Sequence, residues 1–373
     1  MGLGSALSFT QNSAMRAKAV SLLEELTQAH SISGHEDEVR AIFVDELEEC
    51  GDLSSDGNGS VFCEIPGNGP RVLVAGHMDE VGFMVQNITH DGYLQILAIG
   101  GWWEHSLLSQ RVEILTRGGE KVLGVIASRP PHFLPEAQRR QVMTMEQLYI
   151  DVGANSRRAV MEQFGISMGD PVAPVSAFTA LPRQDYYMGK AFDNRVGMAG
   201  VIQAGQIFAQ SENGNHVILC GTVQEEVGLR GAKTAGNFIK PDVVIVLEGP
   251  PADDTHGASV HDCQGRLGGG VQIRMFDPTA IAHPRLARLA IETAEAEGIT
   301  HQITVRRSGG TDAGSFHTAH EGIPTIVLGT PARYIHSHNG IIDLNDYLHM
   351  LALTVALVRR LDQETVDGLV RYI

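Results

Sequence analysis

Cysteine and long apolar runs are scarce in this sequence of 373 residues. Its four cysteines show no CxxC spacing, so we expect no cysteine-based zinc site, and reduced thiols favour a cytoplasmic setting. No stretch approaches the roughly 18 apolar residues that a membrane-spanning helix requires. The first residues also lack the basic and apolar regions of a signal peptide. We therefore expect a cytoplasmic protein with no membrane partner.

Basic residues are also few. The chain has 28 lysines and arginines against 44 aspartates and glutamates, which gives a formal net charge of −16 at pH 7. Nucleic-acid phosphates bind basic surfaces, so this balance argues against a nucleic-acid partner. Hydrophobic residues make up 43% and charged residues 19%, which is typical of a folded globular protein. At this length two domains are the natural expectation.

Hydrophobic periodicity predicts an α/β domain that carries an insertion. Long helices and strands alternate in two blocks, residues 15–79 and 179–373. Between them, residues 80–178 predict short strands joined by hairpins at His90-Asp91-Gly92 and Arg117-Gly118-Gly119. Strand–helix alternation on both sides of a β-rich block predicts one discontinuous α/β domain, with 80–178 as a small β-rich domain inserted into it.

Candidate metal ligands occur where apolar, strand-like runs give way to loops. Open α/β sheets place their ligands at the carboxyl ends of strands, so we expect these side chains to converge. Three carboxylates and two imidazoles suit a pair of divalent metals and predict metal-assisted hydrolysis. The five candidates are His77, Asp193, Glu226, Glu248 and His336.

Each candidate also has a plainer interpretation. His77 alone would be an ordinary loop histidine, but Asp79 two residues later could hold its second ring nitrogen. Asp193 precedes a predicted helix and could equally be its N-cap. His336 could lie in a surface loop, since the chain has 16 histidines. The other candidates make the ligand interpretation of each stronger.

Gln224-Glu225-Glu226 is the sharpest motif. Adjacent carboxylates usually mark a solvated turn, but these follow an apolar strand run and would lie at a buried sheet end. Two like charges in such a place repel unless a cation or a proton compensates. We therefore predict Glu226 as a metal ligand and Glu225 as a general base.

Three further motifs have weaker signals. Gly309-Gly310-Thr311-Asp312 predicts a flexible turn whose polar groups face the same rim and bind substrate. The run from Gly265 to Gly270 lacks the Lys-Ser/Thr of a phosphate-binding loop, so we expect an ordinary loop. Ser33-Gly34-His35-Glu36 matches a capping box before a helix.

These residues together resemble the glutamyl and tetrahedral aminopeptidases, which are cytosolic co-catalytic metallopeptidases. The likeness runs from about residue 17 to the end of the chain and rests on eight ordered motifs. They are Ser33–Glu36, Gly76–Gly82, Gly100–Trp102, Gln110–Val112, Asp193–Arg195, Gln224–Gly228, Gly309–Asp312 and Arg333–Ser337.

The resemblance implies two divalent metal ions per subunit, zinc or cobalt before manganese. His77, Asp193 and Glu248 would hold one ion, and Asp193, Glu226 and His336 the other, with Glu225 as the base and Asp79 as the partner of His77. It also implies a mixed-sheet α/β/α metallopeptidase domain with a PDZ-like dimerisation domain inserted, and a homo-oligomer of twelve subunits built from dimers.

Two positions depart from the family pattern. Members usually carry Asp where this chain has Glu248, which could change metal occupancy. Position 338 is usually Pro, and His338 adds an imidazole that could compete with His336.

The favoured interpretation is an aminopeptidase that removes N-terminal residues from short peptides through a two-metal bridging hydroxide, with Glu225 as general base. A metal-dependent deacetylase or deacylase on the same site stays open, and so does an endoglucanase-like carbohydrate hydrolase. Paired carboxylates suit a glycosidase, but adjacent glutamates with two histidines fit metals better. A non-enzymatic assembly protein is the third class.

Overall fold

The computed structural model describes residues 11–211, 213–259 and 263–373. Within these residues the main sheet has nine strands, which are β1 (Asp52–Ser55), β2 (Val61–Ile65), β3 (Arg71–His77), β12 (His216–Thr222), β13 (Val243–Glu248), β14 (Val271–Asp277), β15 (Ala280–Ile281), β16 (His301–Val305) and β17 (Thr325–Gly329). Their order is β1-β2-β12-β3-β13-β17-β14-β15, with β16 paired to β14. The four central strands β12, β3, β13 and β17 are parallel, whereas β2 and β14 join them antiparallel. The sheet is therefore mixed.

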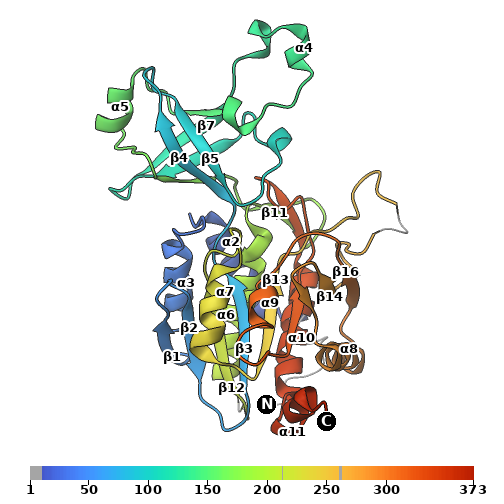
Figure 1. Ribbon diagram of the computed structural model, residues 1–373. Helices are drawn as coiled ribbons and strands as arrows, with labels where there is room; N and C mark the ends of the chain where they lie inside the picture. Colours follow the sequence, from blue (N-terminus) through green and yellow to red (C-terminus); the bar gives the residue numbers. More distant parts are fainter. Residues whose placement is uncertain (1–10, 212, 260–262) are drawn as a thin grey trace.

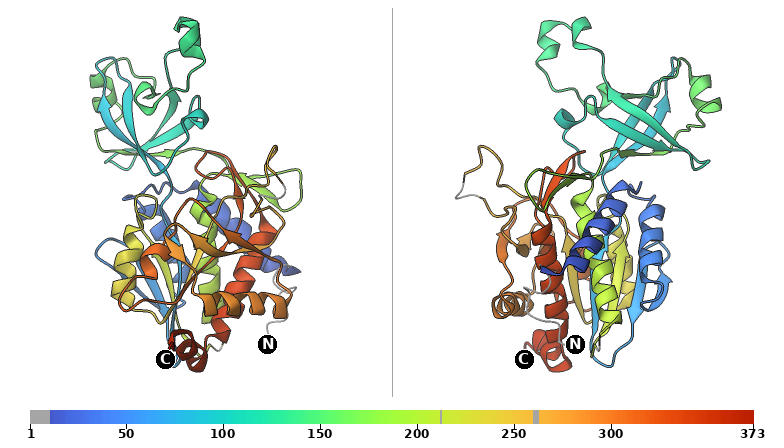
Figure 2. Two further views of the ribbon diagram at one scale, coloured as in Figure 1. Left: turned by 45° about the vertical axis from the view of Figure 1, so that its right-hand side comes forward. Right: turned by 180° about the vertical axis from the view of Figure 1, so that it is seen from behind.

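Helices cover both faces of this sheet (Figures 1 and 2). One layer has α2 (Ser13–Gln28), α3 (Asp37–Leu47), α6 (Phe192–Ala209), α8 (Pro284–Glu297), α10 (Leu344–Arg360) and α11 (Gln363–Val370). The other has α7 (Arg230–Ile239) and the short α9 (Ala313–Phe316). Both faces of each central strand are therefore buried, and such strands are almost continuously apolar.

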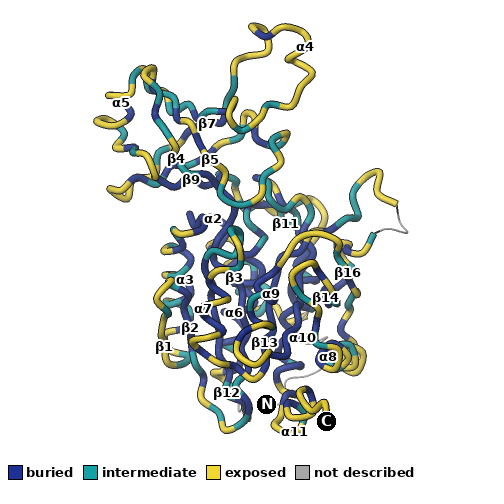
Figure 3. Tube along the Cα trace, viewed as in Figure 1, coloured by how far each residue is buried: buried dark blue, intermediate teal, exposed yellow. Residues whose placement is uncertain are grey.

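Side-chain alternation along β3 divides the core between the two layers. Val72 and Val74 pack into the cluster under α2, α3, α6 and α10, while Leu73 and Ala75 pack into the cluster under α7 and α9. Successive side chains of a strand point to opposite faces, so one apolar run serves both layers. Figure 3 shows the central strands buried along their length.

The inserted part is a closed barrel with its own hydrophobic cluster. Its strands are β4 (Gly82–Ile88), β5 (Leu94–Ile99), β6 (Arg111–Leu115), β7 (Lys121–Ala127), β8 (Tyr149–Asp151) and β9 (Pro171–Pro174). Two helices, α4 (Glu136–Arg139) and α5 (Arg157–Glu162), lie in its connections. The barrel follows β3 directly and stands over the carboxyl ends of the central strands (Figure 1).

The fold class is thus the one expected, a mixed-sheet α/β/α domain with an inserted β-rich module. The boundaries 80–178, and the role of the module in dimer formation, stay predictions. A second sheet, with four strands among the described residues, lies near the base of the barrel (Figure 1). It consists of β10 (Thr179–Ala180), β11 (Tyr186–Gly189), β18 (Ala332–Arg333) and β19 (Gly340–Asp343).

Helix α6 approaches the sheet unusually closely. A Cβ atom built on Gly197 would lie 2.3 Å from Asn194 Oδ1 and 2.4 Å from the Leu247 carbonyl oxygen. Only glycine fits there, and the close approach brings the start of α6 against the ends of β3 and β13. No helix among the described residues has the length and apolarity needed to span a bilayer.

Candidate metal centre

The five predicted ligands converge above the carboxyl ends of the central strands. His77 and Glu248 are the last residues of β3 and β13. Glu226 follows β12 on a short turn, Asp193 lies at the start of α6, and His336 lies in the loop between β18 and β19. Segments far apart in the sequence therefore supply one cluster.

His77 lies at the centre of this cluster. Its Nε2 atom is 3.1 Å from Asp193 Oδ1, 3.6 Å from Glu248 Oε2 and 4.0 Å from Glu225 Oε2. Its Nδ1 atom is 3.0 Å from the carbonyl oxygen of Asp79 and 3.5 Å from Oδ1 of the same residue. A carbonyl can only accept, so Nδ1 carries a proton, and Nε2 faces the carboxylates, where a cation would take its lone pair as in a metal-ligating histidine.

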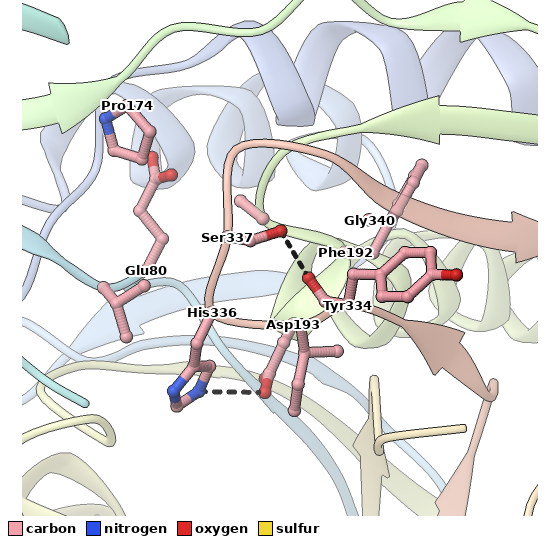
Figure 4. Close-up of a pocket in the computed structure, with 11 residues that line it drawn as sticks. Glu80, Pro174, Phe192, Asp193, Tyr334, His336, Ser337 and Gly340 are labelled. Carbon is pink, nitrogen blue, oxygen red and sulfur yellow. Dashed lines mark hydrogen bonds and ion pairs between the residues drawn. The ribbon is translucent and has the colours of Figure 1, made fainter. Parts of the chain in front are cut away.

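His336 repeats this pattern on the other side of Asp193. Its Nδ1–H donates to the Gly101 carbonyl oxygen at 2.8 Å. Its Nε2 atom is 3.5 Å from Asp193 Oδ2 and 3.3 Å from Glu226 Oε1. Figure 4 shows the His336 ring directed at the Asp193 carboxylate. One carboxylate therefore lies between two imidazoles and presents one oxygen to each.

Asp193 does not cap α6. Both Asp193 and Asn194 have non-helical backbone angles, and the regular helix begins after them. Asn194 Oδ1 instead accepts the N–H of Gly197 at 2.9 Å, which is the bond of an N-cap residue. Because the neighbouring asparagine caps the helix, the Asp193 carboxylate is available to the cluster.

Asp79 holds the turn that carries the two adjacent glutamates. One of its oxygens accepts the Glu225 N–H at 2.9 Å, and the other accepts the Glu226 N–H at 3.1 Å and the Ser33 hydroxyl at 2.6 Å. Glu36 accepts the Gln224 N–H at 3.1 Å. These buried carboxylates fix where the Glu225 and Glu226 side chains start.

The predicted capping box at residues 33–36 is therefore wrong. Helix α3 starts at Asp37, after Glu36, with no side-chain cap. Ser33 bonds the Asp79 carboxylate, and Glu36 accepts backbone N–H groups from Gly34 and Gln224. The local spacing predicted a helix cap, whereas the Ser33 and Glu36 side chains bond to residues distant in the sequence, Asp79 and Gln224. Sequence reasoning missed Ser33 and Glu36 as supports of the site, and their position in a motif of the resemblance was the available signal.

Burial disfavours the ionised form of the glutamates in the site. It raises the pKa of Glu225 well above the usual value, against the opposing charge of His77. It also raises the pKa of Glu226 and of Glu248. Neighbouring carboxylates repel one another in low dielectric, so the cluster requires positive charge to stay ionised.

Without a bound cation, protonated imidazoles supply the positive charge that these carboxylates require. Burial disfavours the charged form of His336, but Asp193 and Glu226 raise its pKa to about 11. Burial would likewise raise the pKa of Asp193, yet His336 and His77 outweigh it and hold that pKa below the usual value. Divalent cations would replace these protons, which is the usual linkage between metal binding and proton release.

The donor set fits divalent metal. Among the described residues, two overlapping groups have ligand atoms within 4.8 Å of one another, namely His77, Glu225 and Glu248, and His77, Asp193 and Glu226. Glu248 Oε1 is buried there without a hydrogen-bond partner. Such an atom is costly to bury, and a cation would satisfy it. The division into two ligand sets stays a prediction. Glu248, which stands where the family pattern has Asp, does lie in the cluster, with Oε2 3.6 Å from His77 Nε2.

A cavity of about 500 Å³ opens beside the cluster. Its wall includes Gly309, Gly310 and Thr311, whose role in substrate binding stays a prediction, and also Arg274, which the sequence analysis did not name. Asp312 is not on this wall. It is fully buried and paired with the hydroxyl of Thr222 on β12, so the prediction that it faces the rim is corrected.

Two other predictions concern loops. That His338 could compete with His336 stays a prediction; its Nε2–H donates to the Arg111 carbonyl oxygen at 3.0 Å, and its ring lies beside Trp102 of the barrel. The glycine run forms a loop whose Gly268 and Gly270 N–H groups donate to Asp346, each at 2.7 Å. An internal carboxylate thus takes the donors that a phosphate would need.

Carboxylates and imidazoles gathered at the carboxyl edge of an open α/β sheet define a hydrolase-type site. The sequence model of the M42 glutamyl aminopeptidase family matches residues 59–353, and the chain belongs to that family. It is 35% identical to the glutamyl aminopeptidase of Lactococcus lactis subsp. cremoris (strain MG1363), over 94% of this chain and 98% of the relative.

Two solved structures share the whole fold. A TET aminopeptidase from a marine sediment Thaumarchaeota archaeon superimposes with a TM-score of 0.92 at 39% identity, over 95% of this chain and 99% of the other. The TET1 peptidase of Pyrococcus horikoshii, which can assemble into a tetrahedron or a large octahedral shell, has a TM-score of 0.82 at 31% identity, over 92% and 100%. The inserted barrel is therefore part of the shared architecture.

Proposed function

We propose that this chain is a two-metal aminopeptidase that removes N-terminal residues from short peptides. The observation that carries the proposal is the Asp193 carboxylate, which has Oδ1 3.1 Å from His77 Nε2 and Oδ2 3.5 Å from His336 Nε2. Each imidazole has its other nitrogen on a backbone carbonyl. Two ligand-ready histidines on either side of one carboxylate are what a shared, bridging ligand requires.

His77, Asp193 and Glu248 would hold one divalent ion, and Asp193, Glu226 and His336 the other. Zinc and cobalt suit this mixture of nitrogen and oxygen donors, and manganese is compatible with it. When bound, such ions polarise a substrate carbonyl and make water more acidic.

Glu225 would move the proton. Its Oε2 atom lies 4.0 Å from His77 Nε2, and the residue lines the cavity. Its carboxylate would accept a proton from the attacking water and give it to the leaving amine nitrogen. Burial raises its pKa, which is the direction that a base working near neutral pH requires. Asp79 would position this residue through the Glu225 N–H.

The cavity wall would orient the peptide. Gly309, Gly310 and Thr311 offer a flexible backbone edge opposite the cluster. A free α-amino group would lie against the carboxylates and a metal, so an acetylated terminus would lose a charge-assisted contact. Groups left unpaired at a buried polar site make such discrimination steep.

The barrel would mediate subunit contacts rather than chemistry. The similar Pyrococcus horikoshii peptidase can assemble into a tetrahedron or a large octahedral shell, and we propose a dodecamer built from dimers for this chain. A closed shell would admit only short peptides.

The four cysteines of the chain are free thiols. The cytoplasmic location stays a prediction.

The test compares a short peptide with its N-acetylated twin on metal-loaded protein, with Glu225→Gln as the matched variant. We expect the wild-type protein to cleave the peptide with the free N-terminus and not its acetylated twin. The Glu225→Gln variant should cleave neither peptide. Comparable cleavage of both substrates would replace the aminopeptidase proposal with a broader amide hydrolase. Cleavage of neither, with release of acetate from an acetylated sugar, would favour a deacetylase.

A further inference from the structure

His336 is the proposed ligand with the weakest support from its own domain. Its side chain is 32% exposed, against 1% for His77 and 15% for Asp193. It lies in a loop between two short strands, where Tyr334 and His336 both have left-handed backbone angles, with φ of 60° and 54°. Its Nδ1–H contacts the Gly101 carbonyl oxygen, which belongs to the connection between barrel strands β5 and β6.

His338, two residues later, makes a second attachment to the barrel. It is 2% exposed, and its Nε2–H donates to the carbonyl oxygen of Arg111, the first residue of β6. Its ring lies 5.7 Å from that of Trp102, the residue after Gly101. Trp102 is itself fixed, because its Nε1–H donates to the Gly82 carbonyl oxygen at 3.0 Å and its ring stacks on Phe83. The loop is thus held at two points of the barrel.

We propose that His338 is a positioning residue through which the barrel sets the ligand atom of His336. The inference rests on the proposed function, because it assigns His338 a role at the second metal. Among the described residues, the imidazoles in ion-pair contact with the carboxylates of the cluster are those of His77 and His336; His338 instead lies against the barrel, on Arg111 and beside Trp102. By tying the loop to β6 it keeps the Gly101 carbonyl against His336 Nδ1, and so keeps His336 Nε2 within 3.5 Å of Asp193 and Glu226.

The expected effect is confined to one ion. Side chains that orient a metal ligand typically change metal affinity by about 10–100-fold. The other proposed ligands lie at strand ends or at the start of α6 and have no contact with His338 among the described hydrogen bonds. Loss of the His338 donor should therefore weaken the ion that includes His336 and leave the other unchanged.

The test is cobalt binding by calorimetry on the metal-free full chain, which needs no peptide substrate. His338→Met and His338→Gln have nearly the same length, but only glutamine can donate to the Arg111 carbonyl. His336→Ala identifies the binding stage that depends on His336. We expect His338→Met to weaken that stage alone by about 10–100-fold, and His338→Gln to recover most of it.

Wild-type affinity in His338→Met, or equal weakening of both stages in the Met and Gln variants, would overturn the inference. If His338→Met does not fold, His338→Phe keeps a ring beside Trp102 without a donor and serves in its place. A single binding stage in the wild-type chain would remove both this inference and the two-metal site. Two stages without peptide cleavage would remove the proposed function and leave the role of His338 standing.

Discussion

The substitution Asp79→Asn should lower both the stability of the protein and kcat, because Asp79 holds the turn that carries Glu225 and Glu226. Both oxygens of Asp79 accept hydrogen bonds, one from the Glu225 N–H and the other from the Glu226 N–H and the Ser33 hydroxyl. Asparagine keeps the shape but replaces one acceptor oxygen with an NH₂ donor. At least one N–H or hydroxyl of this group then loses its acceptor.

The size of the effect follows from burial. Asp79 is 0% exposed, so no water replaces the lost acceptor. A hydrogen bond to a charged group contributes about 1.5–3 kcal/mol, and a buried donor without a partner costs about 1–3 kcal/mol. We expect the free energy of unfolding of the metal-free protein to fall by about 2–4 kcal/mol. A disturbance of about 3 kcal/mol at Glu225 corresponds to a roughly 10²-fold lower kcat.

Urea unfolding of the metal-free protein and kcat of the metal-loaded protein measure the two effects. Asp346→Asn is the matched control, because Asp346 is also buried and accepts two backbone N–H groups at 2.7 Å, but in the glycine loop. Burial raises the pKa of Asp346 to about 7, so the comparison belongs at pH 8, where this carboxyl is mostly ionised. The control should lose stability and keep kcat. Wild-type stability and kcat in Asp79→Asn would refute the reasoning.

Three further outcomes are expected. Glu225→Gln should keep its metals and lose about 10²–10⁴-fold in kcat, whereas Glu226→Gln should lose metal; the reverse result would exchange their roles. Burial lowers the pKa of His30 from 6.5 to about 4, so the unfolded chain binds a proton that the folded chain refuses, and stability falls as pH drops from 6.5 to 4. His30→Leu should remove up to about 3 kcal/mol of that loss in urea titrations of metal-free protein, and an unchanged pH dependence would contradict this. Light scattering should find a closed oligomer, and a fully active monomer would refute the assembly proposal.

Strand ends were the predictable part of the site. The apolar runs before His77 and Glu248 had to be buried, and the first polar side chain after such a run emerges at the carboxyl edge of the sheet. The same logic placed Glu226 after β12. Each of these positions depends on residues close by in the sequence, so pattern alone carried the information.

Distant partners were not predictable. Asp193 could equally have been a cap until the structure gave that role to Asn194. Nothing in the spacing around His336 indicated that a barrel carbonyl, Gly101, would hold its second nitrogen. Asp312 was expected at the rim, but pairing with Thr222 on a central strand draws it inside.

Helix α7, for which the sequence analysis made no prediction, contains the two glycines Gly231 and Gly236. A Cβ atom built on Gly231 would lie 2.3 Å from the Val223 carbonyl oxygen, so this glycine is required by close packing against the end of β12. Glycine lowers helix propensity, so close packing rather than propensity accounts for the glycine at this position.

Diffraction from crystals of cobalt-loaded protein, recorded at the cobalt absorption edge, tests the central claim most directly. We predict two anomalous peaks among His77, Asp193, Glu226, Glu248 and His336, about 3.5–4 Å apart. A single peak beside Asp193, Glu226 and His336 would mean that Glu248 weakens the other ion. No peak within the cluster, with cobalt bound elsewhere or not at all, would contradict the account.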